Sequence, residues 1–392
     1  MEAALAEELG ELALLHPSLH IHNQVPGGVH CSGKLVDAYR INLHSRIASR
    51  VLLRIAHASY LNENDIYDLT LAQTWEDWFS VHCTIRIDIT AIKSPLKSLE
   101  FTTLKIKDAI CDRFREQFSE RPSVDTKNPD MRIIGFLDTR HVTLYLDTSG
   151  EALFKRGWRL ETGDAPLREN LAAGLLRVAG WRPGMVLFDP MCGSGTILIE
   201  AAQMLSGIPA GARRSFAFEK FHGFLADEWR AIKSAIKANP SPAEPTIFGS
   251  DISGDAIAMT RHNLQQAGIV FEVPLKQIEA QEIKPLTDQP GILLTNPPYG
   301  ERIGVRGDSS VDEDDLAKQF FSEFGTTLKQ RFAGWKVFLF TADLGLPRLL
   351  RLKEARKTPF FNGALECRLF RFDMVQGYNR REAAMPSGDG TS

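Results

Sequence analysis

From residue 186 onward, short apolar runs alternate with longer segments of helical periodicity, and this alternation constrains the fold more than any other feature. The expected strands are 186–190, 247–252, 270–277, 292–295 and 336–341, and the expected helices are 196–205, 254–267 and 316–331. Such alternation predicts a mostly parallel, doubly wound sheet with helices on both faces. Residues 356–374 are typical of a closing antiparallel hairpin. The predicted fold class of this part is therefore α/β.

The first of these strands runs into a glycine-rich turn, Asp-Pro-Met-Cys-Gly-Ser-Gly-Thr at residues 189–196. Such a turn before a helix lets a ligand approach the backbone closely. A phosphate-binding P-loop would need a lysine that is absent here, and a dinucleotide fingerprint would need a third glycine after Gly193 and Gly195. Asp189 would repel a pyrophosphate but can accept from an ammonium group. These residues favour S-adenosylmethionine over both nucleotide ligands.

The next two strands also end in acidic residues, which fits the same ligand. Asp251 is placed to accept from both ribose hydroxyls, as the acidic residue of nucleotide sites does. Glu279 can accept from the adenine amino group. The residues that we expect at the cofactor are Asp189, Met191, Cys192, Gly193, Gly195, Thr196, Asp251, Ile252, Glu279 and Asn296.

The strand at 292–295 ends in Asn296-Pro297-Pro298-Tyr299, a stiff corner that combines bare acceptors with an aromatic ring. Methylation of an exocyclic base amine needs such acceptors, because the amine lone pair is delocalised into the ring. If the Asn296 oxygen and the Pro297 carbonyl accept the two hydrogens, the lone pair is aimed at the methyl donor. Tyr299 would stack on the base, which must be unpaired or flipped out. We assign Asn296, Pro297, Pro298 and Tyr299 to the catalytic site, which works by positioning and electrostatics.

The residues before this domain have a different pattern, typical of a small α+β unit. We expect helices at 2–15, 46–56 and 104–118, a strand at 81–91 and a hairpin over 131–149 that turns at 138–140. The expected organisation is 1–50 as an N-terminal segment, 51–150 as a separate domain, 151–165 as a connector, 166–376 as the α/β domain and 377–392 as a flexible tail.

Composition narrows the class of protein. The net charge is −3, and the first 164 residues are slightly acidic, so any RNA contact must use local basic patches. The five cysteines form no Cys-x-x-Cys pair, which argues against disulfides or a zinc site. There is no long apolar run and no signal peptide pattern. We expect a cytoplasmic protein with no membrane contact and no metal.

The motifs "DPMCGSGTILIEAA", "GSDIS" and "LTNPPYGERIG" resemble the seven-stranded, Rossmann-like class I S-adenosylmethionine-dependent methyltransferases. The runs "KIKDAICDRFRE", "LDTSGEALFKRGWR", "APLRENLAAGLLRVAGW" and "NGALECRLF" resemble the THUMP-containing bacterial enzymes that methylate guanine N2 in 23S rRNA. The likeness runs from about residue 5 to 373. It implies that residues 1–50 are a ferredoxin-like segment and that 51–150 are a THUMP RNA-binding domain.

The resemblance also implies site residues and an RNA substrate. Asp189, Gly193, Gly195, Asp251 and Glu279 correspond to the cofactor pocket, and residues 296–299 to the target amine. Phosphate contacts are expected from Lys105, Lys107, Arg113, Lys155, Arg156 and Arg159. Glu279 stands where the family more often has aspartate. Many members continue into a second methyltransferase domain, so we expect only the guanine-N2 half here, behind an incomplete N-terminal subdomain.

Other functions remain open at this point. Related THUMP enzymes methylate guanosine in tRNA with the same type of site. An Asn-Pro-Pro-Tyr corner also occurs in adenine-N6 DNA methyltransferases and in enzymes that methylate a release-factor glutamine, although neither substrate calls for an RNA-docking domain. A non-catalytic RNA-binding or assembly factor is the alternative from a different class. The intact Asp189, Asp251 and Asn296 argue against it.

Overall fold

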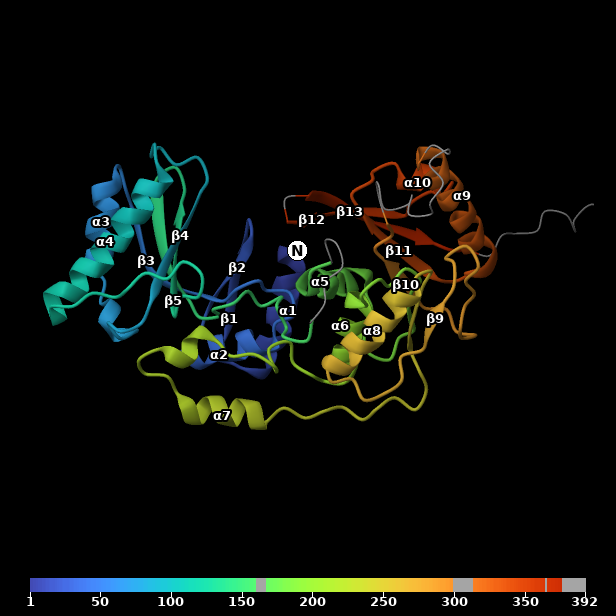
Figure 1. The fold of residues 1–392 in the computed structure, drawn as a ribbon, viewed down its shortest axis with the longest axis horizontal. Helices are drawn as coiled ribbons and strands as arrows, with labels where there is room; N and C mark the ends of the chain where they lie inside the picture. Colours follow the sequence, from blue (N-terminus) through green and yellow to red (C-terminus); the bar gives the residue numbers. More distant parts are fainter. Residues whose placement is uncertain (160–166, 299–312, 364, 376–392) are drawn as a thin grey trace, which may run out of the picture. The chain divides into compact units, whose positions relative to one another are not determined.

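A segment from the middle of the chain folds with the N-terminal half. The computed structural model describes residues 1–159, 167–298, 313–363 and 365–375, and the chain divides into two units. Unit 1 is Met1–Leu160, Arg168–Gly174 and Gln203–Pro240, and unit 2 is the remainder. Helix α5 (Glu169–Ala179) contributes residues to both. The labels in Figure 1 are used throughout. In the described part of the chain, no helix is both long and apolar enough to cross a membrane.

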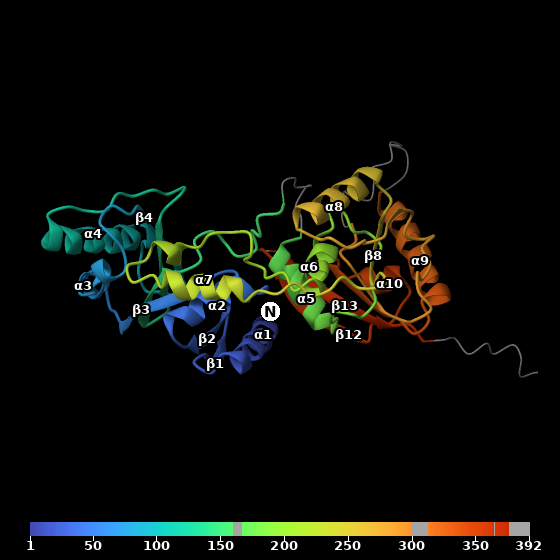
Figure 2. The same cartoon turned by 90° about the horizontal axis from the view of Figure 1, so that it is seen from below.

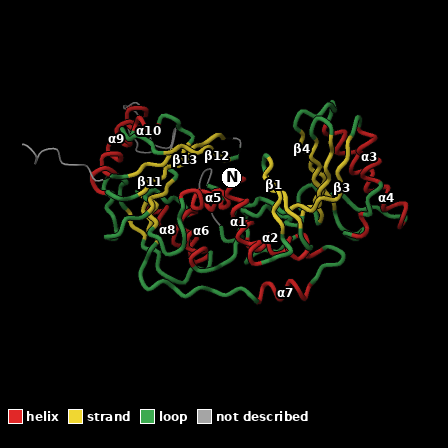
Figure 3. Tube along the Cα trace, turned by 180° about the vertical axis from the view of Figure 1, so that it is seen from behind, coloured by secondary structure: helices red, strands yellow, loops and turns green. Residues whose placement is uncertain are grey.

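Unit 1 is built around a four-stranded sheet with the order β3-β6-β5-β4. Its strands are β3 (Leu52–Ser59), β4 (Ile85–Ala91), β5 (Met131–Leu137) and β6 (His141–Asp147). Helices α3 (Glu63–Leu71) and α4 (Leu99–Phe118) lie on the same side of this sheet (Figures 1 and 3). The short η1 (Trp75–Asp77) follows α3. Alternate strand residues such as Ile133 and Leu144 are buried beneath the helices.

The remaining elements of the N-terminal half are α1 (Glu2–Leu15), the hairpin β1 (His20–Val25) and β2 (Gly28–Ser32), and α2 (Leu35–His44). The expected helix over 46–56 is wrong, because residues 52–59 form strand β3. The run Val-Leu-Leu-Arg-Ile can satisfy either period, and its pairing with β6 decides the outcome. The helix at 104–118, the strand within 81–91 and the hairpin over 131–149 are confirmed.

The segment 203–240 joins unit 1 through aromatic side chains. It carries η2 (Ala217–Lys220) and α7 (Ala226–Ser234). Phe218 is fully buried and stacks on Tyr39 of α2, with ring centroids 4.1 Å apart and planes at 19°. Trp229 of α7 meets Phe218 edge to face at 5.1 Å. These rings belong to one hydrophobic cluster that also contains inward-facing residues of the four-stranded sheet. The insertion therefore completes the core of unit 1.

Replacing Phe218 with alanine is expected to destabilise unit 1 by about 3–5 kcal/mol, because truncating a buried aromatic removes its contacts and leaves a cavity. Urea denaturation followed by tryptophan fluorescence measures the change. Phe361→Ala is the matched control, since Phe361 is 63% exposed on a strand of unit 2. Equal stability of the two variants would contradict the role assigned to segment 203–240.

Unit 2 contains a seven-stranded sheet with the order β12-β13-β11-β10-β7-β8-β9, which confirms the expected architecture. Its strands are β7 (Leu187–Asp189), β8 (Ile247–Asp251), β9 (Leu275–Gln277), β10 (Ile292–Thr295), β11 (Lys336–Thr341), β12 (Arg356–Asn362) and β13 (Leu365–Asp373). Strands β11, β10, β7, β8 and β9 are parallel to one another. Strands β12 and β13 form the expected antiparallel hairpin. The strand expected over 270–277 is shorter than predicted.

Helices α6 (Thr196–Leu205), α8 (Gly254–Gln266), α9 (Glu313–Arg331) and α10 (Leu346–Leu349) accompany this sheet. Figures 1 and 2 show α6 and α8 side by side and separate from α9 and α10. A methyl group at Gly249 of β8 would lie 2.4 Å from Leu198 of α6, so α6 packs closely on that face. Phe188 points to the opposite face and stacks on Phe332, which follows α9. Because β10, β7 and β8 are adjacent parallel strands, their carboxyl ends are neighbours at one sheet edge.

Candidate active site

The glycine turn after β7 is held in a shape that requires glycine. Gly193 and Gly195 have φ angles of 54° and 81°, in the region that L side chains rarely adopt. A Cβ on Gly195 would lie 2.6 Å from the Thr260 side chain, whereas one on Gly193 would meet nothing within 4 Å. Gly195 thus allows close packing against α8. Gly193 leaves open space in front of its backbone, where a ligand can approach.

Two residues of α8 fix this turn, and the sequence analysis missed both. The Thr260 hydroxyl donates to the Gly193 carbonyl at 2.7 Å. The Asn263 amide donates to the Ser194 carbonyl at 3.1 Å. The available signal was their i, i+3 spacing on the helix after Asp251, which places both side chains on one helix face.

Asp251 joins the ends of β7 and β8. One carboxylate oxygen accepts from the Gly193 N–H and the other from the Ser253 N–H, both at 2.9 Å. Each oxygen keeps a lone pair for a further donor. Ile252 follows with a half-exposed apolar side chain, which offers a surface for a planar ring. The Ile278 N–H donates to the Asp251 carbonyl at 2.9 Å. Glu279 is the next residue along the chain after this hydrogen bond.

Asp189 is buried at the end of β7, with 2% of its surface exposed. Burial raises its pKa from 3.8 to about 7, and the nearby charge of Asp251 adds to the shift. The Met191 N–H, which donates to the Asp189 carboxyl at 3.3 Å, only partly offsets it. A buried carboxylate with this pKa is stabilised by a cationic partner, and a ligand ammonium would provide one.

The other residues expected around the turn occupy structural positions. Cys192 is buried, which raises the pKa of its thiol well above the usual value, so it remains protonated. Its N–H donates to the Ser250 carbonyl at 2.9 Å and ties the turn to β8. Thr196 is buried and begins α6. Met191 is partly buried beside Asp189.

Asn296 directly follows β10, the strand between β7 and β11. Its side-chain oxygen is buried and has no hydrogen-bond partner among the residues that the structure describes. A buried acceptor of this kind lacks the stabilisation that a donor would supply. Pro297 is buried and Pro298 partly buried. Tyr299 lies outside the described residues.

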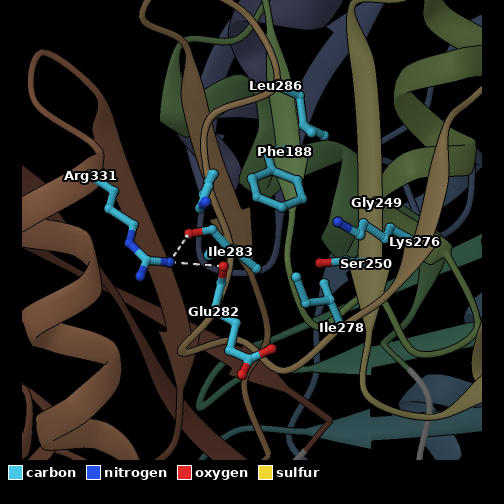
Figure 4. A pocket seen from close by; sticks show the side chains of 10 residues that line it. Phe188, Gly249, Ser250, Lys276, Ile278, Glu282, Ile283, Leu286 and Arg331 are labelled. Atoms are coloured by element: carbon cyan, nitrogen blue, oxygen red, sulfur yellow. Dashed lines mark hydrogen bonds between the residues drawn. The ribbon is translucent and has the colours of Figure 1, made fainter.

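A cavity of about 390 Å³ lies on the other face of the same strands (Figure 4). Its wall includes Phe188, which immediately precedes Asp189, and Ser250, which immediately precedes Asp251. Because side chains alternate along a strand, Phe188 and Ser250 point away from the face of Asp189 and Asp251. Arg331 donates from the cavity wall to the carbonyls of Glu282 and Ile283. The cavity is therefore separate from the cluster formed by Asp189, Asp251 and Asn296.

The three basic residues expected to contact RNA from α4 each have an acidic or aromatic neighbour. Lys107 pairs with Asp108, Arg113 pairs with Glu76, and Lys105 donates to Asn64 and lies over the rings of Tyr67 and Phe101. The Lys107–Asp108 pair is partly exposed and contributes little stability, whereas the side chains of Arg113 and Glu76 are only 20% and 18% exposed. Their charge is nevertheless largely balanced on this helix.

The basic residues around the connector are less accessible. Arg156 is 2% exposed and donates to the carbonyls of Leu153 and Arg46, so in this structure it supports the fold of unit 1. Arg159 forms an ion pair with Glu169 at 2.9 Å, and both side chains are largely buried. Lys155 is exposed and pairs with Glu151. The connector thus presents fewer accessible cations than its sequence indicates.

Comparisons with protein families agree with this geometry. A family model described as "RMKL-like, methyltransferase domain" matches residues 156–371. A THUMP domain model matches residues 60–147, and an RlmL ferredoxin-like domain model matches residues 1–52. The fold and the glycine turn are those of a class I methyltransferase. The methyltransferase model covers more than half of the chain, which therefore belongs to the RMKL-like methyltransferase family.

Individual relatives support the same assignment. The chain is 38% identical over 369 residues to "Ribosomal RNA large subunit methyltransferase K/L" of Psychromonas ingrahamii, covering 93% of this chain and 47% of the relative. It is 34% identical to "Putative RNA methyltransferase slr0064" of Synechocystis, covering 95% of this chain and 94% of the relative. The chain thus spans about half the length of the K/L relative and nearly all of the second.

Solved structures show the same fold. A "possible methylase" from Clostridium difficile 630 superposes with a TM-score of 0.84 at 28% identity, over 97% of both chains. A second structure, of "SMU.472, a putative methyltransferase complexed with SAH", superposes with a TM-score of 0.77 at 26% identity, over 96% of both chains. The similarity in both cases extends over both units.

Asp189→Asn is expected to stabilise the ligand-free protein above pH 7. The folded protein holds the Asp189 proton up to about pH 7, whereas the unfolded chain releases it near 3.8. Stability therefore falls as pH rises through this window, by up to about 4 kcal/mol. Asparagine removes this loss, so the variant should be more stable at pH 8 and similar to the parent protein at pH 4. Denaturant unfolding at both pH values measures the difference, and a variant that is less stable at pH 8 would contradict the raised pKa.

Proposed function

We propose that this chain methylates the exocyclic N2 amine of a guanosine in 23S rRNA, with S-adenosyl-L-methionine as the methyl donor. The observation that carries the proposal is the buried Asn296 oxygen without a hydrogen-bond partner, at the end of the strand beside Asp189. A base amine supplies the donor that this oxygen lacks. The family and the K/L relatives support an RNA substrate.

The residues around the glycine turn fit the cofactor. Asp189 accepts from its ammonium group, Asp251 accepts from its ribose hydroxyls, and Ile252 packs against its adenine. Glu279 accepts from the adenine amino group, and the open backbone at Gly193 admits the methionine part. The SMU.472 neighbour, which is described as complexed with SAH, supports the same ligand class. The cofactor supplies an electrophilic methyl group on a sulfonium.

The chain then acts on the amine by holding it. The Asn296 oxygen and the Pro297 carbonyl accept the two amine hydrogens, which turns the nitrogen lone pair away from the base plane. Thr295, the last residue of β10, is buried in the sheet directly before this corner. Tyr299 stacks on the flipped base. Positioning of this kind contributes much of an enzyme's rate enhancement without a covalent intermediate.

Two alternative substrates remain. The same chemistry on tRNA uses the same residues and differs only in docking. Adenine N6 is favoured by one observation, a Listeria monocytogenes structure described as a "predicted N6-adenine-specific DNA methylase", which superposes with a TM-score of 0.81 at 26% identity. Both bases present an amine with two hydrogens, so Asn296 alone does not separate them.

Nucleoside mass spectrometry tests the proposal. The protein is incubated with S-adenosylmethionine and either protein-free 23S rRNA, bulk tRNA or DNA. We expect N2-methylguanosine in the rRNA sample only. The same product in tRNA alone would overturn the substrate, and N6-methyladenine would overturn the acceptor. Failure to bind S-adenosylhomocysteine would favour the non-catalytic assembly factor.

Asn296→Ala is expected to lower kcat by about 10²–10³, because it removes one oriented acceptor at the reacting amine. Affinity for S-adenosylhomocysteine should stay within about threefold of the parent value. Gln289→Ala, on the exposed loop before β10, is the matched control and should leave both quantities unchanged. An equal loss of cofactor affinity in Asn296→Ala would show that Asn296 belongs to the cofactor site.

A further inference from the structure

In the described part of the chain, the four-stranded sheet of unit 1 has one face without helices. Helices α3 and α4 lie together on one side of the sheet (Figure 1). On the other side, outward residues alternate with core residues along each strand, and most of the outward ones are exposed or partly exposed. We call this surface the open face. It is defined by Arg54 and His57 of β3, Arg86, Asp88 and Thr90 of β4, Arg132, Ile134 and Phe136 of β5, and His141, Thr143 and Tyr145 of β6.

Two aromatic side chains stand at its centre. Tyr145 is on β6 and Phe136 on β5, the two inner strands of the sheet. Tyr145 is opposite Ile134, and Phe136 is opposite Thr143, so the two rings are diagonal neighbours on one face. Both are partly exposed, and the Tyr145 hydroxyl makes no hydrogen bond within the described residues. Two partly exposed rings that are diagonal neighbours on one face offer aromatic surfaces on which planar groups can stack.

Arginines surround these rings. Arg54 of β3 is directly opposite Tyr145, and Arg132 and Arg86 are paired on β5 and β4. Among described groups Arg54 has neither a hydrogen bond nor an ion pair, and its side chain is exposed. Asp88, the one acid among the residues that define this face, pairs with Arg86 and Arg132. The buried Asp147 at the end of β6 pairs with Arg50. The open face therefore keeps an excess positive charge within an acidic half of the chain.

The helical side of the same sheet differs in its charge. On α4, Lys107 and Arg115 pair with Asp108 and Asp112 of the same helix. A phosphate that docked there would have to displace these carboxylates and would be repelled by them. The open face carries no such local competition at Arg54. Charge thus favours the open face over α4 as the surface for a polyanion.

We propose that the open face binds single-stranded RNA, with bases stacked on Tyr145 and Phe136 and a phosphate held by Arg54. Unstacked bases that lie on the aromatic rings of a four-stranded sheet are a general mode of RNA recognition. In an A-form duplex the bases are already stacked on each other, so the rings have no free base face to contact. This inference rests on the proposed function, because the RNA substrate is the source of the strand.

Fluorescence anisotropy with the full chain tests this surface. The probes are a labelled 12-nucleotide single-stranded RNA and a blunt 12-base-pair RNA duplex. We expect Tyr145→Ala to weaken single-strand binding about tenfold or more, with little change in its salt dependence. Arg54→Ala should weaken it severalfold and reduce the slope of log K against log salt by about 0.7. Duplex binding should be weaker than single-strand binding and unaffected by Tyr145→Ala.

Matched controls lie on the opposite side of the sheet. Phe101→Ala and Arg115→Ala remove a half-exposed ring and a half-exposed cation of α4, and both should bind like the parent protein. Weaker binding by the α4 variants with parent-like binding by Tyr145→Ala would overturn the inference, as would tighter binding of the duplex. Thermal unfolding checks that each variant is folded.

The RNA-binding assays test the open face independently of the methylation assay that tests the proposed function. Single-strand binding that depends on Tyr145 and Arg54, without methylation of any RNA, would support the open face and refute the proposed reaction. N2-methylguanosine formation together with single-strand binding that is indifferent to both variants would refute the open face alone. Binding of S-adenosylhomocysteine should be the same in all four variants, since unit 2 is unchanged.

Discussion

The site depends on a buried carboxylate, Asp189, at the carboxyl end of a central parallel strand. Both neighbouring strands, β8 and β10, end beside it, so it lies between the second acid of the cluster and the Asn296 corner. Burial raises its pKa to about 7, and no cation among the described residues offsets this. A group in this state is destabilising until a positive ligand arrives. Natural proteins retain such strain at functional positions, where binding of the ligand relieves it.

The surrounding structure keeps that edge rigid. The Asp251 carboxylate accepts from the N–H groups of Gly193 and of Ser253, the N-cap residue of α8, while Thr260 and Asn263 hold the carbonyls of the turn. A ligand therefore meets a turn whose shape is already set, which reduces the entropy lost on binding. Unit 1 is held together differently. There the rings of segment 203–240 pack on Tyr39, and buried arginines such as Arg156 satisfy backbone carbonyls.

Much of this could be predicted from the sequence, and the failures have physical causes. The parallel sheet followed from strand–helix alternation, and the acids followed from their places at strand ends. Residues 46–56 satisfied the helical and the strand periods equally, so pairing with β6 decided what local pattern could not. The rings of segment 203–240 looked like part of the second domain because chain order hides long-range packing. Arg156 looked like a surface cation because burial is not visible in a single sequence. The cluster at Tyr145 and Phe136 depends on strand register, which appears only when the sheet is assembled.

The most direct test of the central role of Asp189 is the number of protons released when S-adenosylhomocysteine binds. Calorimetric titrations in buffers of different ionisation enthalpy measure this number at pH 6 and at pH 8.5. With a pKa of about 7, Asp189 is mostly protonated at pH 6 in the free protein, and in the proposed binding mode it ionises to accept from the ligand ammonium. The account predicts release of close to one proton at pH 6, almost none at pH 8.5, and tighter binding at the higher pH. Binding without proton release at pH 6, or unchanged binding by Asp189→Asn, would contradict it.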